Sequence, residues 1–123
     1  MIDSNGSGVI FSGTGSLTSS NDVVTGNIIS NSRNRWNVES FYPAGTPLGS
    51  GNIVTRNCFW ANSSNPEYRA RGGVSDPYGF SVGAGNVVKR PLYVDASDGN
   101  FKLRAGSGCQ GFGPLHDPPL WPS

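Results

Sequence analysis

A short pattern occurs three times along this chain, near residues 21–32, 51–62 and 85–94. Each copy has a polar start rich in Gly or Asn, then a β-branched pair, a polar break and a second apolar pair. This order predicts a strand, a bend and a second strand. Because a unit of this size cannot bury its own apolar face, the copies must stack on one another to form a core. The repeats therefore predict a solenoid.

The composition favours strands and turns over helices. The 18 glycines and 9 prolines, with abundant Ser and Asn, disfavour helix interiors. The apolar residues are mainly Val, Ile, Phe, Trp and Tyr, which suit a pleated surface. A hydrophobic fraction of 35% is low, but a net charge of +1 and 11% aromatic residues argue against disorder. We expect a single all-β domain.

Charge and hydropathy exclude several partners. Nine basic against eight acidic side chains produce no global field that would attract nucleic acid or an anionic membrane. Met1 is followed by Asp3 and Ser4, without the basic and apolar regions of a signal peptide. No apolar run approaches the length of a membrane span. We expect no nucleic-acid partner and no membrane partner.

Cys58 and Cys109 are the only cysteines. A small extracellular domain that depends on disulfides usually carries more of them. Because free cysteine is among the most buried residue types, we interpret the two as small hydrophobic core residues, with a disulfide as the alternative.

The inward face of the second repeat depends on where the chain bends. Strict alternation places Ile53 with Asn57 and Phe59 on one face. A bend at Thr55-Arg56 instead places Val54 with Asn57 and Phe59 inward. We prefer the bend, because an Asn at a corner can stack on the Asn of the next coil and satisfy its amide along the stack.

This bend predicts an asparagine ladder between coils. Asn27 of the first repeat is expected to lie over Asn57 of the second. In the third repeat Pro91 takes the matching position, so we expect the ladder to end there.

Outside the repeats the sequence predicts loops and short strands. Residues 1–8 are polar and predict a loose start, and 9–11 suit a partial first turn. Residues 78–82 alternate and predict a strand. Asp98-Gly99 predicts a tight turn before an alternating strand at 101–104. Residues 114–123 contain four prolines and predict an extended tail.

Two segments carry a family resemblance. Residues 24–31, Val-Thr-Gly-Asn-Ile-Ile-Ser-Asn, and 54–62, Val-Thr-Arg-Asn-Cys-Phe-Trp-Ala-Asn, resemble coils of right-handed parallel β-helix proteins of the pectate-lyase-like superfamily. The resemblance implies an all-β fold, a short right-handed parallel β-helix of about three coils with long loops. The resemblance covers roughly residues 20–113. We assign residues 1–113 to the β-helix domain and 114–123 to the Pro-rich tail.

The closing segments are the more specific match. Residues 86–95, 98–107 and 111–113 resemble the C-terminal ending of many bacterial β-helix proteins, in which Asp-Pro-Leu-Phe-Val precedes Asp-Phe-Arg-Leu and a Gly-Ser-Pro-Ala turn. The chain departs from this ending with Arg90 for the Asp and with Gly108-Cys109 for Pro-Ala. The resemblance implies a β-helix with an open end, which either belongs to something longer or is covered by another subunit in a homo-oligomer. It also suggests a secreted or cell-surface protein.

The catalytic motifs of this superfamily are not found in the sequence. There is no Asp-Asp pair, and the one histidine, His116, lies in the Pro-rich tail. Glu67, Asp76, Asp95 and Asp98 supply carboxylates for a two-carboxylate hydrolase, but the last two are better explained as turn formers. We assign no catalytic residue.

The sequence gives little support for a metal site. Residues 95–100 are rich in oxygen side chains but lack the distal acid of a calcium loop, so we interpret them as a turn. We assign no metal and no cofactor, with calcium as the alternative. Arg69 and Arg71 alternate, and an extended backbone would turn both guanidinium groups toward one carboxylate or sulfate. This is the basis of a lyase alternative.

The best candidate site is a cluster of aromatic residues on two long insertions, 31–43 and 63–77, which successive coils would place on one side of the stack. Aromatic faces with adjacent polar donors suit sugar binding. The alternative is that these rings cap the core beneath the loops. The candidate residues are Trp36, Tyr42, Trp60 and Tyr68, with Arg35, Arg69 and Arg71 as polar neighbours.

We therefore expect a non-catalytic carbohydrate-associated or structural β-helix module, with a polysaccharide as partner. One alternative is a polysaccharide lyase or glycoside hydrolase that acts on an acidic polysaccharide. Another is a structural piece similar to those of phage tails, which predicts a flat stack without a groove.

Overall fold

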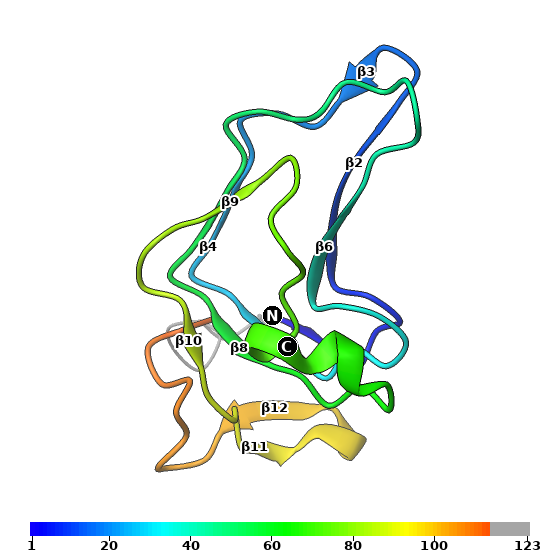
Figure 1. Ribbon diagram of the computed structural model, residues 1–123. Helices are drawn as coiled ribbons and strands as arrows, with labels where there is room; N and C mark the ends of the chain where they lie inside the picture. The colour runs from blue at the N-terminus through cyan, green and yellow to red at the C-terminus, as the bar shows by residue number, and fades with distance from the viewer. Residues whose placement is uncertain (114–123) are drawn as a thin grey trace, which may run out of the picture.

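The chain folds into an all-β solenoid of about three turns, as the sequence predicts (Figure 1). The computed structural model describes residues 1–113, and the predicted Pro-rich tail at 114–123 lies outside the described residues. Three parallel sheets form the sides of the solenoid. The predicted fold class, a short parallel β-helix, is confirmed.

The largest sheet has four parallel strands, and the chain adds one strand each time it returns to this side of the solenoid. The second sheet has three, and the third pairs β2 with β6 and continues through a parallel bridge from Val38 to Val74. The four-stranded sheet consists of β1 (Ile2–Asp3), β5 (Ile28–Ser30), β8 (Cys58–Trp60) and β10 (Val87–Val88). The others consist of β4 (Val23–Thr25), β7 (Ile53–Thr55) and β9 (Ser81–Val82), and of β2 (Val9–Thr14) and β6 (Val38–Phe41).

Five further elements complete the fold. β3 (Leu17–Thr18) pairs antiparallel with β2, and the 3-10 helix η1 (Pro66–Gly72) lies beside β8. β11 (Tyr93–Asp95) and β12 (Asn100–Leu103) form an antiparallel hairpin joined by η2 (Ala96–Asp98), which confirms the turn expected at Asp98-Gly99.

Two sequence predictions about short elements are corrected. Residues 1–8 are not a loose start, because β1 pairs with β5 through Ile2 and Ile29 and so begins the first coil. Within 78–82 only Ser81–Val82 forms a strand.

The predicted bend in the second repeat is confirmed. Arg56 has a φ of 54°, the left-handed conformation that turns the chain between β7 and β8. As a result Val54, Asn57 and Phe59 all lie inward and are fully buried, with at most 1% of their surface exposed.

The asparagine ladder is longer than the sequence predicts. The Asn27 backbone N–H donates to Asn57 Oδ1 at 2.9 Å, and the Asn57 backbone N–H donates to Asn86 Oδ1 at the same distance. The expectation that the ladder ends at Pro91 is wrong, because Val87 pairs with Cys58 and this register places Asn86 at the position of Asn57. The third coil thus continues the ladder, and the chain leaves the stack only after β10.

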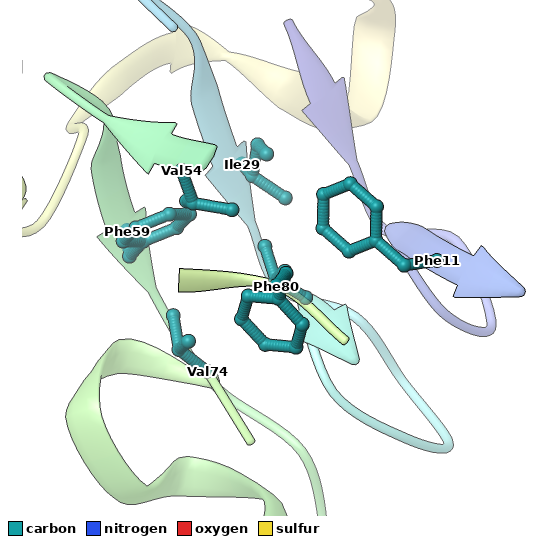
Figure 2. Packing of buried hydrophobic residues seen from close by; sticks show 7 residues of the cluster. Phe11, Ile29, Val54, Phe59, Val74 and Phe80 are labelled. Atoms are coloured by element: carbon teal, nitrogen blue, oxygen red, sulfur yellow. The ribbon is translucent and has the colours of Figure 1, made fainter. Parts of the chain in front are cut away.

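The interior holds one main apolar cluster (Figure 2). Phe11 from the first coil stacks on Phe80 from the third at 5.0 Å between ring centroids, beside Val54 and Phe59. Each buried side chain of this size stabilises the fold by about 1.5–3 kcal/mol. In the last coil, Val82 pairs with the inward-pointing Val54 and Val88 pairs with the inward-pointing Phe59. Val82 and Val88 nevertheless remain 46% and 49% exposed. Association of copies through this end stays a prediction.

The C-terminal segment packs across the outer side of the four-stranded sheet. A second apolar cluster forms there around Ile28 and Cys58, with Tyr93 and Leu103 of the β11–β12 hairpin packed against it. Cys109 reaches this cluster and forms a disulfide with Cys58. The interpretation of two free buried cysteines is therefore wrong, because the chain folds back over the sheet and brings the two sulfurs together.

Tyr93 connects the hairpin to the first coil. Its hydroxyl lies 2.6 Å from Ser30 Oγ, and Ser30 donates its single proton to Asp3 Oδ1 at 2.6 Å, so Tyr93 is the donor to Ser30. Burial raises the pKa of Tyr93 to about 12, with the nearby Asp3 charge adding to the effect.

We expect the stability of the fold to depend on this hydroxyl at high pH. Because the folded pKa lies above the unfolded value near 10, its contribution is fully present below about pH 10 and is lost as the pH rises through about 12. Urea unfolding across this range should show a steeper loss of stability in the wild type than in Tyr93→Phe. If stability fell equally steeply with pH in both proteins, the pKa of Tyr93 would not be raised by folding.

Candidate functional site

Two of the predicted aromatic residues meet at the corner where the chain enters β6. Trp36 lies two residues before β6, and Tyr68 lies in η1. Their rings pack edge to face, with centroids 5.4 Å apart and an angle of 71° between the planes. Both residues are half-buried, so part of each remains accessible to solvent.

Local sequence explains the position of Tyr68. Asn65 caps η1 by accepting a hydrogen bond from the Glu67 backbone N–H at 3.0 Å, and Pro66 follows at the first helical position. The insertion at 63–77 thus contains a short helix that presents Tyr68 toward Trp36.

Arg35 is held over this aromatic pair by a buried carboxylate. Its Nε and Nη2 donate to Glu39 Oε1 at 2.9 and 2.7 Å, and its guanidinium carbon lies 5.7 Å from the centre of the Tyr68 ring. The Glu39 side chain is only 4% exposed, whereas that of Arg35 is 54% exposed. The hydrogen bond to Glu39 raises the pKa of Arg35. We call Arg35, Trp36 and Tyr68 the corner platform.

Glu39 and Ser7 complete the site, and the sequence analysis missed both. Ser7 Oγ donates to Glu39 Oε2 at 2.9 Å, so Arg35 and Ser7 both satisfy the buried carboxylate. Breaking such a buried pair would leave an uncompensated charge. A sequence signal did exist, because Glu39 stands within the strand-like run Val38–Phe41, where an acidic side chain needs a partner.

The structure does not bring the other two aromatic candidates into the platform. Tyr42 follows the far end of β6, where its ring packs against Tyr78 at 6.1 Å and its hydroxyl donates to Gly79 O at 3.4 Å. Trp60 lies half-buried at the end of β8, and no ring contact among the described residues involves it.

Arg69 and Arg71 do not form the predicted parallel pair. Both lie in η1, and Arg71 has a φ of 53°, so the backbone is not extended. Arg71 Nε donates to Val74 O at 3.0 Å, and its Nη2 forms an ion pair with Asp76 at 3.1 Å. Arg69 is exposed beside Tyr68. The extended backbone that would turn both guanidinium groups one way is therefore not present in this segment.

Asp95 has a structural role in the turn that joins β11 and β12. Asp95 Oδ1 accepts hydrogen bonds from Ser97 Oγ and from the Asp98 backbone N–H, which closes the η2 turn. Within residues 1–113 no group of three or more His, Cys, Asp or Glu side chains is placed to hold a metal ion. His116 lies outside the described residues.

No helix in the described part of the chain is long and apolar enough to cross a membrane.

Comparisons with known proteins do not identify the class of this protein, so its fold and site define that class. No family model, no curated protein and no solved structure matches this chain. The class that the fold and the site define is a short parallel β-solenoid with an aromatic and arginine platform at one corner.

Proposed function

We propose that this protein is a non-catalytic β-helix module of the pectate-lyase-like superfamily that binds carbohydrate at the corner platform. The observation that carries the proposal is the fixed position of Arg35. Its guanidinium is held by Glu39 on one side and lies over the Tyr68 ring on the other. A group held in place before binding loses little conformational entropy when a ligand arrives.

The platform offers the two kinds of contact that a sugar needs. The partly exposed rings of Trp36 and Tyr68 offer apolar surface for a pyranose. Arg35 uses Nε and Nη2 for Glu39, which leaves the Nη1 hydrogens to donate to hydroxyl groups.

Support for a non-catalytic role comes from the nearby carboxylates. Glu39 is buried and bonded to Arg35 and Ser7, and Asp76 is paired with Arg71. A two-carboxylate hydrolase needs two acids that face the sugar from opposite sides. A lyase at the Arg69/Arg71 segment would have to release Arg71 from Asp76.

Binding of polysaccharides to purified variants tests the proposal. We expect polygalacturonate, alginate, xylan or mixed-linkage glucan to retard the wild type in affinity electrophoresis. Trp36→Ala and Tyr68→Ala should each weaken binding about tenfold, the size of one aromatic contact. Trp60→Ala is the matched control and should bind as the wild type does.

Two outcomes would contradict the proposal. Equal loss of binding in Trp60→Ala and Trp36→Ala would move the site away from the platform. Release of unsaturated or reducing sugar products during the same incubations would show that the module is catalytic.

A further inference from the structure

We propose that the ligand of the corner platform is a chain of several sugars, which lies along β6 on the outer face of the β2–β6 sheet and makes its second contact at Phe41 and Ile10. This inference rests on the proposed function. It adds a second contact site and a requirement for ligand length.

The register of the two strands defines the outer face. Ile10 pairs with Glu39, and Ser12 pairs with Phe41. Because Val38 points into the core and side chains alternate along a strand, Glu39 and Phe41 point outward. Phe41, the last residue of β6, is 63% exposed, and Ile10, the second residue of β2, is 47% exposed.

This face is continuous with the corner platform. Arg35 lies over Tyr68 of the platform and bonds to Glu39, and Phe41 follows two residues later on the same face of β6. The backbone from Trp36 to Phe41 spans at most roughly 17 Å, the length of five residue steps in a fully extended strand, and the bend at Asn37 shortens it. This length exceeds one sugar ring and suits an extended oligosaccharide.

The chemistry of the face fits a sugar chain better than a protein. Its large apolar side chains are Ile10 and Phe41, and the ion pair of Arg35 with Glu39 interrupts them. A stable protein interface needs roughly 800 Å² per partner with an apolar centre, more than two such side chains supply. Alternating apolar and hydrogen-bonding groups match the alternating faces and hydroxyls of a polysaccharide.

A hollow continues the path beyond Phe41. Ser12, the register partner of Phe41, also lines an open hollow of about 390 Å³. The lining is small and rich in hydroxyl groups, with one exposed leucine, and it consists of Ser12, Gly13, Thr14, Leu17, Thr18 and Ser19. Hydroxyl groups around a shallow hollow suit the end of a sugar chain.

The test compares oligosaccharides of increasing length. Disaccharides, tetrasaccharides and octasaccharides prepared from polygalacturonate, alginate, xylan and mixed-linkage glucan are titrated against the protein by calorimetry. For the polysaccharide that binds, the octasaccharide should bind the wild type at least about tenfold more tightly than the disaccharide. Phe41→Ser should remove most of this gain. Val23→Ser, at a 61% exposed valine of β4, is the matched control and should retain it.

The outcomes separate this inference from the proposed function. Equal affinity for all lengths, with binding still weakened by Trp36→Ala, would overturn the extended site and leave the platform intact. No binding of any oligosaccharide to the wild type would overturn both. If Phe41→Ser fails to fold by circular dichroism, Ile10→Ser replaces it, and an unchanged length dependence in that variant would contradict the inference.

Discussion

Replacement of Cys58 and Cys109 by alanine is expected to lower the free energy of unfolding by about 4 kcal/mol. The disulfide closes a loop with a sequence separation of 51 residues, which restricts the unfolded chain. It also anchors the C-terminal segment to the four-stranded sheet, because both cysteines are fully buried in the cluster around Ile28. Urea unfolding of the oxidised wild type and the double variant measures the difference.

Two controls separate the disulfide from simple loss of side-chain volume. The wild type unfolded in the presence of a reductant should match the double variant within about 1 kcal/mol. Hydrogen exchange in the double variant should speed up first in the β11–β12 hairpin, whose link to the solenoid is weakened. An unchanged unfolding midpoint would show that the bridge contributes nothing to stability.

Replacement of Asn57 by leucine is expected to cost roughly 3–5 kcal/mol. Asn57 is fully buried, and its Nδ2 donates to Val24 O at 2.9 Å and to Thr55 O at 3.0 Å, while its Oδ1 accepts from the Asn27 backbone N–H. Leucine leaves these backbone groups unpaired in the interior, at about 1–3 kcal/mol for each buried group. Thermal and urea unfolding measure the loss.

The matched control is Asn62→Leu, because Asn62 is exposed on the same repeat. A surface substitution of this kind should change stability by no more than about 0.5 kcal/mol. If both leucine variants unfolded at the same denaturant concentration, the ladder would not be a source of stability.

Repeats and local bends were predictable because they depend on neighbouring residues. Which residues of the second repeat point inward could be inferred from an Asn at a corner. The structure places Val54 and Phe59 inward as expected. The register of the third repeat was not predictable in this way. In the second coil both Asn52 and Asn57 accept a backbone N–H from the preceding coil, so Gly85-Asn86 matches either position in sequence. Only the pairing of Val87 with Cys58 decides between them.

The site was predictable in part for a similar reason. Trp36 and Tyr68 lie on insertions of neighbouring coils, and the stacking of coils brings them together. Tyr42 follows the end of β6 that is opposite to Trp36. The positions of the insertions in the sequence do not reveal this separation. The disulfide depends on how the segment after β10 folds back across the sheet, and no repeat encodes that path.

The most direct test of carbohydrate binding at the corner platform is a titration followed by the indole N–H signals of the three tryptophans. The signals are assigned by single substitutions, and the polysaccharide identified by affinity electrophoresis is added as its octasaccharide. The platform predicts that the Trp36 signal shifts with saturation while the Trp60 signal stays in place. A shift of Trp60 or Trp121 without Trp36, or no shift at saturating binding, would contradict the site.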